Sequence, residues 1–89
     1  MKKIAIIILN WNGKQDTLDC LHSIKKSTYT NYEIIVADNG SLDGSKDAIA
    51  RAYSDVLIID NQSNLGFAEG NNRALEIALA KEIDYVFRL

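Results

Sequence analysis

The sequence predicts an α/β fold: an open, mainly parallel βαβαβαβ sheet with helices on both faces. Four short β-rich runs each end at a polar cluster, and three segments with helical spacing lie between them. The first run, Ile-Ala-Ile-Ile-Ile-Leu at residues 4–9, is apolar throughout. A strand covered on both faces requires this pattern, whereas a half-exposed strand would alternate. At 89 residues and 9.9 kDa, the chain is predicted to form a single domain, 1–89.

Each element can be placed along the chain. Strands are predicted at residues 4–9, 33–37, 56–60 and 85–89. The first helix is predicted over residues 14–26, and the other two on the apolar faces at 48–53 and 67–79. The chain contains no proline, so Gly, Asn, Asp and Ser must set the helix ends. Asp43 or Ser45 is predicted to cap the second helix, and Asn64 or Gly66 to lie near the start of the third.

Composition and charge argue against several classes of protein. Ten basic and twelve acidic residues give a net charge of −2 with no basic block, so no nucleic-acid partner is expected. One cysteine, Cys20, and one histidine provide neither an internal disulfide nor a soft metal site. The apolar opening at 4–9 is too short to span a bilayer and carries no cleavage signal. A cytoplasmic protein is therefore expected.

Polar residues gather after the first three predicted strands, at residues 10–13, 38–44 and 60–67. Seven of the eight asparagines lie in or just after these loops. In an open α/β sheet, ligands bind beyond the carboxyl ends of the strands, and neutral donors and acceptors there suit a nucleobase or a sugar. The alternative is that Asn, Asp and Gly merely form turns, because they tolerate positive φ. The shared position of all three loops at one edge favours a ligand site.

Two residues in these loops have two interpretations each. Trp11, the only tryptophan, can pack in the core, stack on a planar base, or do both. Asp38 either caps the turn that follows it or accepts a hydrogen bond from a ligand. Other known sites do not fit the sequence. The first loop lacks G-x-G-x-x-G, no P-loop lysine pattern occurs, and Asn10 and Asn12 stand where a receiver domain needs acidic metal ligands.

Three motifs occur in order: N-W-N-G at 10–13, V-A-D-N-G-S-L-D-G-S at 36–45, and N-L-G-F-A-E-G-N-N at 64–72. Together they resemble the start of a family 2 glycosyltransferase of the GT-A fold, closest to the rhamnosyltransferase-like branch. The resemblance covers nearly the whole chain and implies the nucleotide-binding half of a truncated GT-A domain. It further implies that this half binds a nucleotide-sugar donor, and that the parent enzyme transfers the sugar to an acceptor hydroxyl with inversion.

The resemblance also implies which residues meet the donor. Leu9 and Trp11 should line the base pocket, and Asn39 should meet the base edge, where its amide can accept from and donate to uracil or thymine. A UDP- or dTDP-sugar is therefore expected. Gly70 stands where the family often has an arginine, which leaves that donor contact in doubt. The full set of predicted nucleotide-binding residues is Leu9, Asn10, Trp11, Asn12, Asp38, Asn39, Gly40, Asn64, Gly66 and Asn71.

The largest departure from the family concerns its catalytic residues. The D-x-D motif that holds Mg²⁺ or Mn²⁺ would follow the last predicted strand and the catalytic base would come later, so no catalytic or metal-binding residue is expected in this chain. We expect a fragment that is inactive alone. The alternative is a non-catalytic nucleotide-binding or assembly module of the same fold. Exposed apolar sheet also predicts a homodimer or larger assembly.

Overall fold

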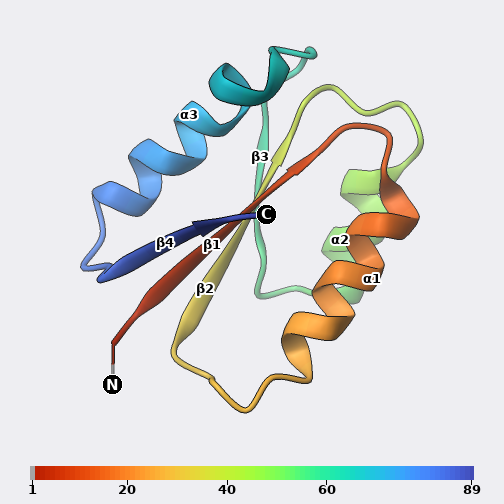
Figure 1. Ribbon diagram of the computed structural model, residues 1–89. Helices are drawn as coiled ribbons and strands as arrows, with labels where there is room; N and C mark the ends of the chain where they lie inside the picture. Colours follow the sequence, from red (N-terminus) through yellow and green to blue (C-terminus); the bar gives the residue numbers. More distant parts are fainter. Residues whose placement is uncertain (1) are drawn as a thin grey trace.

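The computed structural model describes residues 2–89, and Figure 1 shows one sheet with helices on both of its faces. In chain order the elements are β1 (Ile4–Asn10), α1 (Lys14–Lys25), β2 (Tyr32–Asp38), α2 (Ser45–Ala52), β3 (Leu57–Asp60), α3 (Gly66–Leu79) and β4 (Tyr85–Arg88). The predicted βαβαβαβ order is confirmed. No helix in this described part of the chain is long and apolar enough to cross a membrane.

The sheet has the strand order β3-β2-β1-β4, and all three pairings are parallel. The chain starts in the middle of the sheet at β1, moves outward through β2 to β3, and then crosses to β4 on the other side of β1. Helices α1 and α2 cover one face, and α3 covers the other (Figure 1). Strand order therefore reverses between β1 and β4, the kind of position where open α/β sheets bind ligands.

Two apolar cores lie on the two faces of the central strands. Ile8 is buried in one core with Leu21 of α1 and Ile49 of α2. Its neighbour Ile7 is buried in the other core, together with Ala74 of α3. Successive strand residues point to opposite faces, so a strand between two helical layers must be apolar at every position. This requirement explains the unbroken apolar run at the start of the sequence.

Element boundaries differ from the predictions by one to three residues. β1 and β2 each run one residue further than expected, to Asn10 and Asp38, because these residues continue the register of the parallel pair. Helix α2 begins at Ser45, and its N-cap position is occupied by Gly44 in the left-handed region at φ 79°. Asp43 still serves the start of this helix, because its Oδ1 accepts a hydrogen bond from the Ser45 backbone N–H at 3.0 Å.

Candidate functional site at the carboxyl edge of the sheet

The three Asn-rich loops meet at the carboxyl edge of the sheet. The register sets Asn10 beside Asp38 and Asp38 beside Asp60, so the loops that follow β1, β2 and β3 leave neighbouring strands at the same level. In Figure 1 these loops gather at the top of the molecule. Side-chain hydrogen bonds then join them into two clusters, one between the first and second loops and one between the second and third.

The first cluster is centred on Asn10, which is only 1% exposed. Its Nδ2 donates to Asp38 Oδ1 at 2.8 Å and to Ser41 Oγ at 3.1 Å, while its Oδ1 accepts from Thr17 Oγ at 2.7 Å. The other carboxylate oxygen of Asp38 accepts from the Ser41 backbone N–H at 2.9 Å. These bonds supply the partners that buried polar groups such as those of Asn10 and Asp38 need. They also fix the backbone at the ends of β1 and β2.

Asn12 ties the tip of the first loop to the second. It adopts positive φ, 51°, and its backbone N–H donates to Ser41 Oγ at 2.9 Å. Its Oδ1 accepts from the Leu42 backbone N–H at 2.7 Å. The Lys14 backbone N–H, at the start of α1, donates to Asp43 Oδ2 at 3.0 Å. The first two loops are therefore bonded along their whole length.

The second cluster is a chain of side-chain amides. Asn61 Nδ2 donates to Asn39 Oδ1 and to the Gly70 carbonyl, both at 2.9 Å. Asn39 Nδ2 donates to the Gly66 carbonyl at 3.1 Å and to Asn64 Oδ1 at 3.3 Å. Asn64 Oδ1 also accepts from the Gly66 backbone N–H at 3.0 Å. These bonds attach the first turn of α3 to the ends of β2 and β3.

The second and third loops also touch through their backbones, at Gly40. This residue has φ 75°, and a Cβ there would lie 2.9 Å from Ser63 Cα and 3.0 Å from Ser63 N. Any side chain at Gly40 would therefore be both strained and in collision with the third loop. The contact keeps the two loops against each other.

Large apolar side chains are exposed around these clusters. Trp11 is 55% exposed and Phe67 is 61% exposed, and Leu42 and Leu65 are exposed as well. The interpretation of Trp11 as a core residue is therefore wrong. Leu9 is half-buried and packs against the core beneath α3. The edge thus presents an accessible indole next to the hydrogen-bonded first and second loops.

Four of the predicted nucleotide-binding residues, Asn10, Asp38, Asn39 and Asn71, are buried. Asp38 is 0% exposed and Asn39 is 1% exposed, and both side chains are bonded to protein. In this structure a ligand therefore reaches neither the acceptor expected at Asp38 nor the base contact expected at Asn39. Turn capping is the observed role of Asp38. Asn71 Nδ2 donates to the Phe67 carbonyl at 2.8 Å, while its buried Oδ1 has no partner among residues 2–89.

Four residues of the two clusters were not among the predicted site residues: Thr17, Ser41, Asn61 and Gly70. Ser41 and Asn61 follow strand ends, so their position in the loops was a usable signal. Thr17 lies a turn into α1, where a polar side chain gives no sign of pointing toward a strand end. A Cβ at Gly70 would lie 2.6 Å from Asn39 Nδ2, and that close approach is visible only in three dimensions.

The described residues do not fit the divalent cation expected for the family. Within residues 2–89, no group of three or more His, Cys, Asp or Glu side chains could hold a metal ion. Two carboxylates near the edge, Asp60 and Asp43, already have partners. Lys46 Nζ lies 2.7 Å from Asp60 Oδ2 and lowers the pKa of that carboxyl. The hydroxyl of Ser45 donates a hydrogen bond to Asp43 Oδ1 and so lowers the pKa of that carboxyl.

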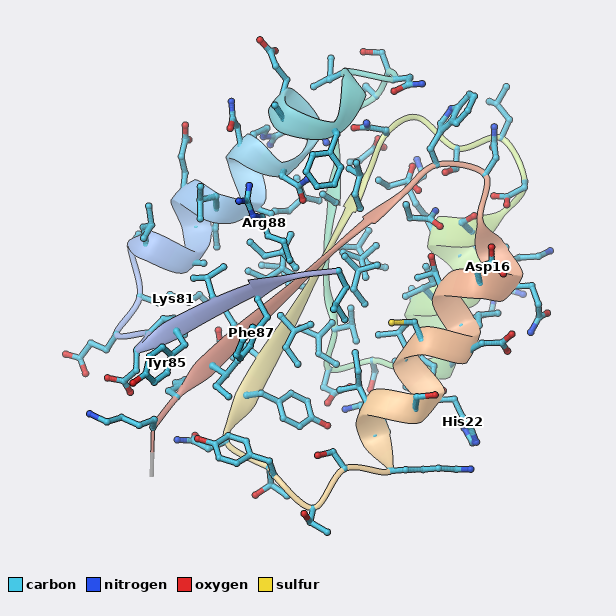
Figure 2. All side chains as sticks on the ribbon, in the orientation of Figure 1. Asp16, His22, Lys81, Tyr85, Phe87 and Arg88 are labelled. Carbon is cyan, nitrogen blue, oxygen red and sulfur yellow. The ribbon has the colours of Figure 1, made fainter. Side chains whose placement is uncertain are left out.

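An apolar groove lies away from these loops, between the C-terminal part of α1 and β4. It encloses about 210 Å³ and is lined by residues that include Ile6, Tyr32 and Phe87. Figure 2 shows Tyr85 and Phe87 spaced along β4, and both are more than half exposed. The groove contains almost no polar surface and lacks the amides of the carboxyl edge, so it is a separate feature.

Comparison with known proteins connects this architecture to one family. The model of glycosyl transferase family 2 matches residues 5–89. The glycosyltransferase YibD of Escherichia coli is 33% identical over 88 residues, which cover 94% of this chain and 25% of YibD. WfaP of Escherichia coli, named as a UDP-Glc:alpha-D-GlcNAc-diphosphoundecaprenol beta-1,3-glucosyltransferase, is 33% identical over 87 residues, covering 97% of this chain and 35% of WfaP.

A solved structure has the same fold. The mannosyltransferase PcManGT from Pyrobaculum calidifontis, in complex with GDP-Man and Mn²⁺, superposes with a TM-score of 0.76 at 24% identity, covering 85% of this chain and 24% of PcManGT. The chain therefore spans between about a quarter and a third of the length of these three relatives. Because the family model matches residues 5–89, which is nearly the whole chain, the chain belongs to glycosyl transferase family 2.

Proposed function

We propose that the chain is the donor-binding part of a glycosyltransferase, and that its three edge loops bind the nucleotide of a nucleotide-sugar. The observation that carries this proposal is that loops from three separate strands are bonded into one surface, with Trp11 exposed beside it. Turn formation would explain each loop singly. It does not explain an exposed tryptophan next to a network that joins all three.

The proposed roles follow from burial. Trp11 stacks on the base, because its indole is accessible and flat, and Leu9 supports the base pocket from beneath. Asn12, Asn64 and Gly66 belong to the loop and helix start that form its rim. The buried residues Asn10, Asp38 and Asn71, together with Gly40, fix the backbone that the ligand meets. Preorganised loops bind tightly because little ordering entropy is lost on binding.

For the donor we propose a UDP- or dTDP-sugar, with a GDP-sugar as the rival. The relative WfaP is named as a UDP-Glc enzyme, which supports a pyrimidine nucleotide. The structural relative PcManGT is in complex with GDP-Man, which supports the rival. Assignment to the rhamnosyltransferase-like branch also stays a prediction, because it rests on the loop motifs alone.

For the complete enzyme we propose transfer of the sugar to an acceptor hydroxyl with inversion, aided by Mg²⁺ or Mn²⁺. A divalent cation would stabilise the charge that develops on the leaving diphosphate. PcManGT, which has the same fold, is in complex with Mn²⁺, which supports a cation for the complete enzyme. The described residues do not form that metal site, so this chain contributes donor binding, and we predict no transferase activity from residues 1–89 alone.

Fluorescence titration tests the donor proposal directly. Trp11 is the only tryptophan, so its emission reports on the carboxyl edge alone. UDP-glucose, dTDP-glucose and GDP-mannose are titrated in turn, and calorimetry checks each dissociation constant. We expect saturable binding, tighter for the pyrimidine nucleotides. The Leu79→Ala variant is a matched control, because Leu79 is exposed at the far end of α3 and its loss should leave the dissociation constants unchanged.

The alternatives give different results in the same experiments. A non-catalytic nucleotide-binding module would bind nucleotide-sugars, and its full-length parent would not transfer them. An assembly module would give no saturable titration with any of the three donors. A tighter constant for GDP-mannose would replace the pyrimidine donor with a GDP-sugar.

We also propose that the chain self-associates through the apolar side of β4. Tyr85 and Phe87 are more than half exposed on this strand, and Phe87 lines the apolar groove together with Ile6 and Tyr32. Contiguous exposed apolar surface of this kind marks interaction sites. Sedimentation at tens of micromolar protein tests the proposal: a dimer or larger species supports it, and a monomeric mass contradicts it.

A further inference from the structure

The side-chain amide of Asn39 is fixed in one orientation. Its Oδ1 faces a donor, Asn61 Nδ2, at 2.9 Å. Its Nδ2 faces two acceptors, the Gly66 carbonyl at 3.1 Å and Asn64 Oδ1 at 3.3 Å. Asn64 cannot turn its own amide without loss, because the same Oδ1 holds the Gly66 N–H at 3.0 Å. If the Asn39 amide were flipped, its Nδ2 would face Asn61 Nδ2, and its Oδ1 would face the oxygens of Gly66 and Asn64.

Gly70 completes this arrangement by having no side chain. A Cβ at this position would lie 2.6 Å from Asn39 Nδ2, 2.8 Å from Asn39 Oδ1 and 2.8 Å from Leu9 Cδ1. The amide of Asn39 thus occupies the space that any other residue at position 70 would need. Asn61 holds the Gly70 carbonyl at 2.9 Å, so the first turn of α3 is attached at both Gly66 and Gly70.

We propose that Asn39 is a positioning residue, which anchors the first turn of α3 to the ends of β2 and β3 and does not contact the base of the donor. The ligand in this proposal rests on the proposed function, whereas the anchoring itself does not. Asn39 is only 1% exposed, and both of its polar atoms are already bonded to protein. Selection among bases therefore falls to other groups of the edge, with Trp11 the exposed aromatic residue among them.

The anchoring needs an amide and not an acid. A carboxylate would still accept from Asn61, but its second oxygen would face the oxygens of Gly66 and Asn64. The neighbouring elements also contribute acidic side chains. Asp38 ends β2 directly before Asn39, and Asp60 ends β3. Glu69 lies in the same turn of α3 as Gly70. The cations Lys46 and Arg73 both bind Asp60, Lys46 through the carboxylate and Arg73 through the backbone carbonyl. Both cations therefore already have partners on β3, and neither bonds to Asn39.

The Asn39→Asp variant tests the proposal through its pH dependence. At about pH 8 the introduced carboxylate is charged, and we expect nucleotide-sugar affinity about tenfold or more below that of the wild type, because the Gly66 carbonyl and Asn64 Oδ1 lose a donor and face a negative charge instead. Burial beside acceptors favours the protonated acid. Its O–H can then replace the lost N–H, so affinity should recover toward about pH 5.5. Asn72→Asp, at an exposed position on α3, is the matched control and should show neither effect.

Direct base contact predicts different results. The charged carboxylate would still accept from the imide N–H of uracil, so UDP-glucose would bind to Asn39→Asp at about pH 8 and weaken on acidification. The loss would also depend on the base. Positioning predicts the same fold-change for UDP-glucose and GDP-mannose, since neither base touches position 39. Unequal fold-changes, or affinity that falls with decreasing pH, overturn the proposal.

Amide hydrogen exchange separates failure of this proposal from failure of the proposed function. In the ligand-free wild type, we expect protection of the Gly66 amide, which donates to Asn64 Oδ1, and of the amides of residues 70–73, which bond to the carbonyls of the first turn of α3. In Asn39→Asp the same amides should lose protection at about pH 8 and regain it at about pH 5.5. Equal protection in both proteins at both pH values overturns the anchoring role. If the exchange pattern is as expected but no donor binds the wild type, the anchor stands and the proposed function fails.

Discussion

Gly70→Ala is the substitution for which helix propensity and the observed packing predict opposite results. Gly70 lies in the first turn of α3 and has no unusual backbone angle, so alanine should stabilise the helix by about 0.5–1 kcal/mol. The structure leaves no room for the added methyl group. Its carbon would lie 2.6–2.8 Å from two atoms of Asn39 and one of Leu9, whereas carbon contacts normally lie at about 3.5–4.0 Å.

The net effect can be worked out from the way each neighbour can yield. Leu9 Cδ1 ends a flexible side chain and can rotate away. The Asn39 amide cannot, because displacing it leaves one N–H of the buried Asn61 amide without its acceptor and removes a donor from the Gly66 carbonyl, at about 1–3 kcal/mol for a buried unsatisfied group. After subtraction of the helix gain of about 0.5–1 kcal/mol, the free energy of unfolding should fall by up to about 2.5 kcal/mol, with a midpoint of about 1 kcal/mol. That is a substantial part of the roughly 4–13 kcal/mol expected for a domain of this length.

Urea denaturation followed by circular dichroism measures this change. The reverse substitution Ala68→Gly, at an exposed position in the same turn, serves as the matched control. It should cost about 0.5–1 kcal/mol from helix propensity alone. If Gly70→Ala is instead more stable than the wild type, by about the amount that the control loses, the close packing of Gly70 on Asn39 is refuted.

Three further predictions address binding, the core and pH. Trp11→Ala should abolish saturable donor binding in calorimetry. Because the indole is exposed, the free energy of unfolding should change by less than about 0.5 kcal/mol. Retained affinity would show that Trp11 does not belong to the site. Leu21→Ala should cost about 2–5 kcal/mol in urea denaturation, because Leu21 is fully buried; a cost below about 1 kcal/mol would contradict the core beneath α1. Glu33 lies 3.0 Å from Lys81 and 3.1 Å from Lys3, and hydrogen bonds from these lysines lower the pKa of its carboxyl. The stabilisation from Glu33 should therefore be present above the ordinary pKa of glutamate and be lost as the pH falls through the lowered value, so unfolding of Glu33→Gln across that range should show a weaker pH dependence than the wild type.

The fold could be predicted from the sequence because its main signals are local. An apolar run such as residues 4–9 requires helices on both faces, and spacing within the intervening segments shows where those helices lie. Boundaries were less accurate where backbone geometry sets them. Asn10 and Asp38 extend their strands only because each continues the register of the other, and a single strand contains no information about its partner.

The meeting of the three Asn-rich loops at one edge was also predictable, since they follow parallel neighbours. The arrangement of their side chains was not. Asn39 and Asp38 have the chemistry of ligand-binding groups, yet both are buried and bonded within the protein. Trp11 has the chemistry of a core residue, yet it is exposed. Residue type shows which hydrogen bonds a side chain can make, whereas the packing of α3 against the sheet decides whether protein or ligand makes them.

Chemical-shift mapping of the nitrogen-15-labelled chain tests the central claim, that the three loops form one nucleotide site, most directly. UDP-glucose is added stepwise and each backbone amide is followed. The proposed site predicts saturable shifts that share one dissociation constant in all three segments, residues 10–13, 38–44 and 61–67. Shifts confined to one loop, shifts only around the apolar groove at Ile6, Tyr32 and Phe87, or no saturable shifts at all would contradict it.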